Sequence, residues 1–167
     1  FAKESDFEKQ IERLSGEIFR SADYCRWAPK LVDAIHDDGV HPDGLLVSLD
    51  RTEWWVVEVE LGRNSKVSHF RDQAGRLNRV KYHKHAKALK NGLKTMKIDS
   101  RHSDKLLEVE PKLLLIMDED NTKMREAANL RGFQTLVLQT FRSVGGKVSI
   151  SVLEEIVPTM EPESKEE

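Results

Sequence analysis

Two glutamates and an aspartate lie on either side of a predicted hairpin turn. Glu58 and Glu60 are one residue apart in a predicted strand, so their side chains point to the same face. A hairpin with an even loop brings Asp43 opposite Glu60 and Leu45 opposite Glu58, with opposed Cβ atoms about 5 Å apart. An odd loop would turn Asp43 to the other face. Three carboxylates are therefore expected to meet at one end of one face.

Carboxylates this close repel one another, so they must pair with arginine or lysine, share protons, or bind a hard cation. Mg²⁺ suits one or two carboxylates together with waters and a substrate phosphate. A metal so placed supplies a nucleophile and stabilises charge on a phosphodiester. We therefore expect Mg²⁺, with Mn²⁺ as a substitute. The alternative is an exposed hairpin with solvated acids, because alternating glutamates are common on half-exposed strands.

The segment that follows is strongly basic. Residues 63–105 hold thirteen lysines and arginines and three acids, a net charge of +10 in a chain whose net charge is −2. Such a segment beside carboxylates favours a polyanionic partner, and we expect nucleic acid, chiefly double-stranded DNA. A solvated helix face is the alternative. The candidate phosphate contacts are Lys66, Arg71, Arg76, Arg79, Lys81 and Lys84.

The elements that position these residues follow from apolar spacing, turn residues and caps. Strands and helices alternate, which predicts an α/β domain on one central sheet over 1–157, with a disordered acidic tail over 158–167. The predicted elements are a helix over 5–20 capped by Ser5 or Asp6, a strand within 30–36 followed by a turn at 37–39, strands over 44–49 and 54–61, a helix capped by Ser65 that runs to about 91–92, a strand over 112–117, a helix over 121–130, and strands over 133–141 and 147–152.

Composition excludes several classes of protein. The chain of 167 residues is 38% hydrophobic and 34% charged, and it has no apolar run that would span a membrane. A single cysteine, Cys25, rules out an internal disulfide and favours a cytoplasmic location. A phosphate-binding P-loop and zinc-ligand spacing are absent from the sequence. Association into a homodimer and a further domain before residue 1 both stay open.

The hairpin carboxylates resemble the motif of the PD-(D/E)XK nuclease superfamily. The run 41–44, His-Pro-Asp-Gly, looks like the PD step, and 58–60, Glu-Val-Glu, looks like the (D/E)XK step. The resemblance implies a restriction-endonuclease-like mixed sheet flanked by helices: a helix, a three-stranded meander, a crossover helix and a further strand. It implies a metal-dependent DNA endonuclease, a hydrolase of prokaryotic or phage DNA defence or processing. Asp43, Glu58 and the backbone carbonyl of Val59 would be the metal ligands.

The chain departs from that motif at Glu60, where the family usually has lysine. Some restriction enzymes of this superfamily have glutamate there, so Glu60 would act as a base or a third ligand, or Lys66 or Lys81 would supply a migrated cation. The resemblance also implies a glutamate on the first helix, for which we expect Glu17 rather than Glu8 or Glu12, and a catalytic glutamine on the crossover helix, Gln73. The alternative function is a catalytically degenerate nuclease-fold module that binds nucleic acid or a protein partner.

Overall fold

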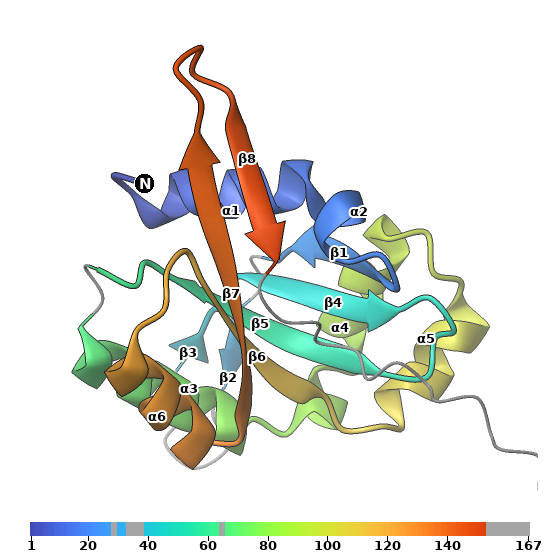
Figure 1. Cartoon of the computed structure of the whole chain (residues 1–167). Coiled ribbons are helices and arrows are strands. Elements are labelled where there is room, and N and C mark those ends of the chain that lie inside the picture. Colours follow the sequence, from blue (N-terminus) through green and yellow to red (C-terminus); the bar gives the residue numbers. More distant parts are fainter. Residues whose placement is uncertain (28–29, 33–38, 64–65, 153–167) are drawn as a thin grey trace, which may run out of the picture.

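The computed structural model describes residues 1–27, 30–32, 39–63 and 66–152, and it has a mixed α/β fold on one curled central sheet (Figure 1). The fold class expected from the sequence is therefore confirmed. In sheet order, the described strands of this sheet are β1 (Ala22–Arg26), β4 (Gly44–Ser48), β5 (Trp54–Glu60), β6 (Lys112–Met117), β7 (Phe133–Arg142) and β8 (Val148–Val152).

The sheet combines an antiparallel meander with two parallel pairs. β1, β4 and β5 are antiparallel neighbours, whereas β5–β6 and β6–β7 are parallel. Parallel neighbours need crossover connections, and helices provide them. The crossover from β5 to β6 contains α3 (Val67–Arg79), the 3₁₀-helix η1 (Tyr82–His85), α4 (Ala86–Thr95) and α5 (Ser100–Leu107), and that from β6 to β7 contains α6 (Thr122–Leu130).

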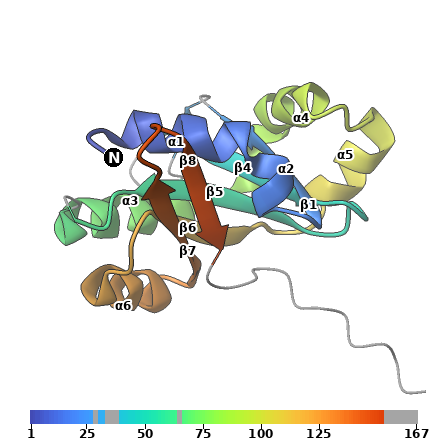
Figure 2. The ribbon, with the colours of Figure 1, turned by 45° about the horizontal axis from the view of Figure 1, so that its top comes forward.

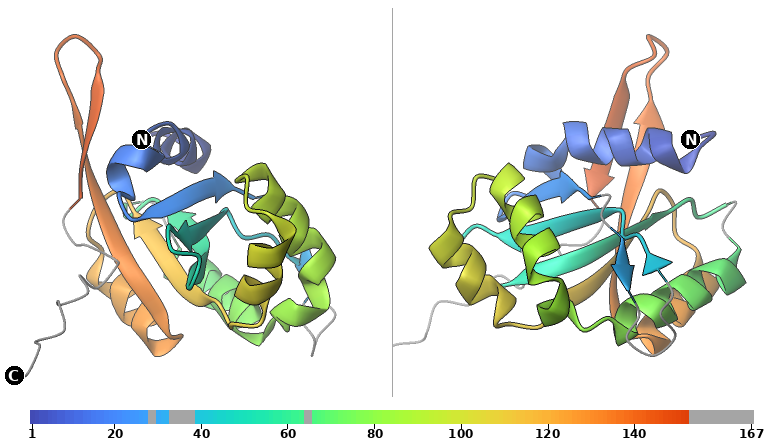
Figure 3. Two further views of the ribbon diagram at one scale, coloured as in Figure 1. Left: turned by 90° about the vertical axis from the view of Figure 1, so that its right-hand side faces the viewer. Right: turned by 180° about the vertical axis from the view of Figure 1, so that it is seen from behind.

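A hydrophobic core lies on each face of the sheet. One core joins alternate residues of β5, such as Trp54 and Val56, to α3, α4, α5 and α6. The other joins Trp55 and Val57 to the amino-terminal helix α1 (Glu4–Arg13). Figure 2 shows α3 and α6 on one side of the sheet and α1 on the other. The β7–β8 hairpin projects beyond both layers, as the side views of Figure 3 show.

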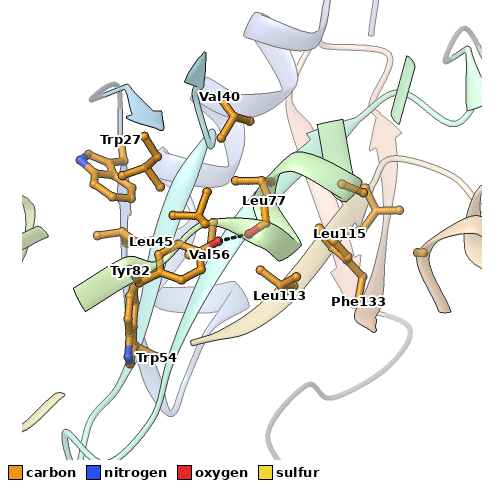
Figure 4. Packing of buried hydrophobic residues seen from close by; sticks show 14 of the residues in the cluster. Trp27, Val40, Leu45, Trp54, Val56, Leu77, Tyr82, Leu113, Leu115 and Phe133 are labelled. Atoms are coloured by element: carbon orange, nitrogen blue, oxygen red, sulfur yellow. Dashed lines mark hydrogen bonds between the residues drawn. The ribbon is translucent and has the colours of Figure 1, made fainter. Parts of the chain in front are cut away.

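The single long helix expected from about residue 65 to 92 is wrong. α3 ends at Arg79, Val80 is extended with φ −60° and ψ 132°, and the chain then turns through η1 into α4. Packing causes the break, because Val80 and Tyr82 are both buried in the core. The Tyr82 hydroxyl donates to the Leu77 carbonyl at 2.8 Å, and its ring meets Trp54 edge-on (Figure 4). The basic residues expected on this one helix are therefore divided among α3, η1 and α4.

The first helix is also shorter than expected. α1 begins at Glu4, so Ser5 and Asp6 lie within its first turn rather than capping it. Leu14 separates it from the short helix α2 (Ser15–Ile18). The first meander strand is β1, which apolar patterning did not reveal because Asp23, Tyr24 and Arg26 interrupt it.

The strand expected within 30–36 corresponds in part to β2 (Leu31–Val32), which pairs with β3 (Gly39–Val40) in a separate small sheet. Most of the turn expected at 37–39, the cap Ser65 and the tail 158–167 lie outside the described residues. Among the described helices, none is both long and apolar enough to cross a membrane.

Candidate active site

The candidate site lies where β4 and β5 separate. β4 pairs with β5 only over Trp54–Val57, while β5 continues to Glu60 against β6. Asp43 occupies the opening: its N–H donates to the Val57 carbonyl at 3.0 Å, and its Oδ2 accepts the Val59 N–H at 2.7 Å. The N–H and C=O of one strand residue point to the same side, so the Val59 carbonyl also points toward this opening.

The hairpin register differs by two residues from the expected one. Gly44 pairs with Val57 and Leu45 with Val56, so Asp43 comes level with Glu58 rather than with Glu60. A shift of two residues leaves every side chain on its expected face. Glu58 and Glu60 are both buried, Glu58 with 1% of its surface exposed. The structure thus brings the three hairpin carboxylates to one end of one face.

Gln73 reaches this face from α3. Its side-chain Nε2 donates to Oε2 of Glu58 at 2.6 Å. The other carboxyl oxygen, Oε1, is buried and has no hydrogen-bond partner among the described residues. A buried oxygen without a partner costs free energy that a ligand would recover. Glu58 is therefore held in place through Oε2, while its buried Oε1 keeps an unused capacity to bind a ligand.

Burial raises the pKa values of both Glu58 and Asp43. Desolvation, followed by the charge of Asp43, raises the pKa of Glu58 well above its ordinary value. Desolvation likewise raises the pKa of Asp43 to about 7, although the hydrogen bond from Val59 opposes the shift. The two carboxyl groups lie close enough for each to act on the pKa of the other. The site accordingly holds protons near neutral pH unless a cation replaces them.

Two glutamates of α1 join the cluster, and sequence reasoning missed both. Glu8 is buried and pairs with Arg26 at 2.5 Å, so the expectation that Glu8 points away from the buried face is wrong. Burial, followed by the charge of Glu60, raises the pKa of Glu4 to about 8. Glu17, the residue expected on this helix, is exposed on α2. Helical spacing could have identified Glu4, because it lies two turns before the buried Ile11 and on the same side of the helix.

The donor set fits a small hard cation held by few protein groups. Among the described residues, no group of three or more His, Cys, Asp or Glu side chains is arranged to hold a metal ion. A site of two carboxylates, one backbone carbonyl and waters does not need such a group, and Mg²⁺ is often bound in this way. Asp43, Glu58 and the Val59 carbonyl are the groups at the opening that would hold such a cation.

The expected nucleic-acid contacts are divided by the break after α3. Arg71, Arg76 and Arg79 lie on α3, and Lys66 immediately precedes it. Lys81 and Lys84 follow the break, in and before η1, and both are exposed. The structure brings the three arginines together along one helix, whereas the lysines lie around its ends.

No family model matches the chain, and no curated protein matches it. Among solved structures it is similar to SfsA of Pyrococcus furiosus, in a structure described as a complex with Ca²⁺, at 10% identity and a TM-score of 0.44. The match covers 89% of this chain and 61% of that one, so the chain spans less than two thirds of its structural neighbour.

Proposed function

We propose that this chain is a divalent-metal-dependent endonuclease of the PD-(D/E)XK type that hydrolyses phosphodiesters of double-stranded DNA. The observation that carries the proposal is the meeting of Asp43 and Glu58 at the opening between β4 and β5, with one oxygen of Glu58 left for a ligand. The surrounding order of α1, the β1-β4-β5 meander, α3 and the parallel strand β6 agrees with the core that the resemblance implies. A role in prokaryotic or phage DNA defence or processing rests on the resemblance alone.

Asp43, Glu58 and the carbonyl of Val59 would hold the metal. When bound, a divalent cation supplies charge that stabilises the developing negative charge on the phosphate and lowers the pKa of water. Gln73 would orient Glu58 by holding Oε2. Occupying the site requires Asp43 and Glu58 to lose their protons, so metal affinity is expected to rise with pH.

Glu60 stands where the resembled family has lysine, and its charge acts on Glu4, Asp43 and Glu58. In the proposed enzyme it takes the proton of the attacking water on a carboxylate oxygen. A general base contributes about 10²- to 10⁴-fold to the rate, so Glu60→Gln is expected to lose activity by about that factor. The arginines of α3 and the lysines at its ends would bind phosphates by charge, which gives affinity without sequence preference.

The direct test is cleavage of plasmid and linear duplex DNA with Mg²⁺ or Mn²⁺, repeated with a chelator. Asp43→Asn and Glu58→Gln are expected to abolish metal-dependent cleavage and to leave DNA binding intact. Glu17→Gln, a change of the same kind at an exposed position, is the matched control and is expected to cleave normally. Cleavage that survives the chelator or either site variant would refute the proposal.

A specific observation favours the second candidate, a degenerate nuclease-fold module that binds nucleic acid or a protein partner. The side chains around Asp43 and Glu58 are mainly acidic, and raised pKa values allow them to share protons without a cation. If the wild-type protein binds DNA without cutting it and Glu60→Lys gains metal-dependent cleavage, the module is the correct assignment. Cleavage by the wild-type protein favours the enzyme.

A further inference from the structure

We propose that the outer edge of β8 pairs with β8 of a second copy of this chain and joins the two central sheets into one. β8 is the last strand in the sheet order, and among the described residues no strand pairs with its outer edge. With β7 it forms the hairpin that rises beyond α1 in Figure 1. The pairing does not depend on the proposed cleavage, because β8 holds none of the residues assigned to the candidate active site.

The backbone of β8 turns its polar groups outward at every second residue. At the hairpin loop the Ser143 N–H donates to the Lys147 carbonyl at 2.9 Å, so this carbonyl points toward β7. Along an antiparallel strand, residues alternate between pointing their N–H and C=O at the partner strand and pointing them away from it. The register of β7 and β8 continues this alternation. The residues whose backbone groups face the open edge are therefore Val148, Ile150 and Val152.

The residue order of β8 reads the same in both directions. The run 148–152 is Val-Ser-Ile-Ser-Val. Pairing about a two-fold axis needs such self-complementarity, because each contact is made twice with the roles of the two copies exchanged. With the axis at Ile150, the two Ile150 residues exchange both backbone hydrogen bonds, and Val152 of each copy does so with Val148 of the other. The residues that the palindrome matches are thus the ones whose N–H and C=O face outward.

The charge of β8 permits this association, whereas the opposite edge of the sheet is protected against it. β8 contains no charged residue and no proline, two features that keep exposed edge strands from associating. β1, at the other edge, carries Asp23 and Arg26. Ile150 packs against the core on the α1 side, which holds β8 in the sheet, and Val152 remains 37% exposed. A second copy therefore meets a preformed edge without bringing like charges together.

The test combines sedimentation equilibrium with amide hydrogen exchange measured by NMR. The protein is studied from about 10 to 300 µM, because a small interface associates weakly. A monomer–dimer equilibrium is expected. Protection of the Ile150 and Val152 amides is expected to rise with concentration more steeply than that of the Ser149 and Ser151 amides, which already face β7. A monomer throughout, or a dimer without this alternating protection, would overturn the proposal. Protection that is independent of concentration would show that the chain covers its own edge, and would overturn it too.

Substitutions at the axis decide whether the backbone bonds hold the dimer. Ile150→Pro removes an outward N–H without removing a bond to β7, and proline is tolerated at such edge positions. It is expected to raise the dimer dissociation constant at least about tenfold, because one hydrogen bond is lost from each copy. Ile150→Val keeps the N–H and is the matched control, with an expected change of less than about twofold. Equal dissociation constants for the two variants would contradict the proposed pairing.

A second variant covers the case in which proline disturbs the hairpin. Ile150→Lys places two like charges opposite each other at the axis and is expected to weaken the dimer as strongly as Ile150→Pro. Circular dichroism shows which variants fold. Asp43→Asn is expected to dimerise like the wild-type protein, so failure of the nuclease proposal leaves this result readable. Full dimerisation of a folded Ile150→Lys would place the interface elsewhere.

Discussion

The side-chain amide of Gln73 donates a hydrogen bond of 2.6 Å to Oε2 of Glu58, and this bond decides which oxygen of the glutamate stays without a partner. Glu58 comes from the sheet and Gln73 from the crossover helix, so the bond forms only when α3 packs on β5. The contact links the packing of the core directly to the orientation of the candidate ligand.

Loss of this bond is expected to destabilise the protein. Gln73→Leu keeps the bulk of the side chain and leaves a second oxygen of a buried carboxyl unsatisfied, at a cost of about 1–3 kcal/mol in the free energy of unfolding. Urea denaturation measures the change. Gln139→Leu, at an exposed position of β7, is the control and is expected to change stability by less than about 0.5 kcal/mol. Equal effects of the two variants would show that the hydrogen bond contributes little.

Stability without metal is expected to fall as pH rises from about 4 to 8. Burial raises the pKa of Asp43 from 3.8 to about 7 and that of Glu4 from 4.5 to about 8, so the folded protein binds more protons than the unfolded chain in this range. Asp43 contributes a slope of up to about 1.4 kcal/mol per pH unit, and Glu4, which is only half-buried, contributes less because solvent screens its charge. Urea denaturation across this range measures the slope.

The same experiment on Asp43→Asn and Glu4→Gln assigns the pH dependence to the cluster. Each variant is expected to show a shallower slope, because its side chain can no longer release a proton. Glu12→Gln, at an exposed position of α1, is expected to retain the slope of the wild-type protein. A slope that is unchanged in both cluster variants would contradict the assignment.

A divalent cation is expected to reverse this loss at high pH. Binding to the folded state alone stabilises it by about 2.7 kcal/mol at a metal concentration one hundred times the dissociation constant. Thermal melting at pH 8 with and without Mn²⁺ measures the gain. The gain is expected to disappear in Glu58→Gln and to persist in Glu17→Gln. A gain of equal size in Glu58→Gln would place the cation elsewhere.

Two glycine substitutions are expected to act in opposite directions. Gly75 lies within α3, where a methyl group makes ordinary contacts, so Gly75→Ala should stabilise the protein by about 0.5–1 kcal/mol. A Cβ atom at Gly62 would lie 2.6 Å from the backbone oxygen of Glu119, so Gly62→Ala should destabilise it by more than about 1 kcal/mol. Thermal melting distinguishes the two. A change in melting temperature of the same sign in both variants would contradict the packing described around these two glycines.

Local patterns in the sequence fix a large part of the candidate site. Strand alternation alone places Glu58 and Glu60 on one face, and an even loop adds Asp43 to that face. The side-chain period of two makes this conclusion independent of a register shift of two residues. The position of Gln73, beside the buried stripe of a helix that follows the hairpin, also comes from local spacing.

Contacts within the hairpin loop fix the register, and the spacing of residues in the sequence does not reveal them. The loop closes at Ser48 and Glu53, where the Ser48 N–H donates to the Glu53 carbonyl at 3.0 Å. The Ser48 hydroxyl accepts the N–H groups of Thr52 and Glu53, and Arg51 takes a left-handed conformation with φ 62°. These bonds centre the loop one residue earlier than expected, which brings Asp43 level with Glu58.

Contacts between distant segments were decided only by the tertiary structure. The helix after β5 ends at Arg79 because Val80 and Tyr82 are buried, and this overrides a helical pattern that continues to about residue 92. Glu4 reaches Glu60 from α1, and Arg131 reaches Gly75 of α3 from the end of α6. The physical reason is that alternation and helical period fix which way a side chain points from its own element, whereas the packing of elements against one another decides which side chains meet.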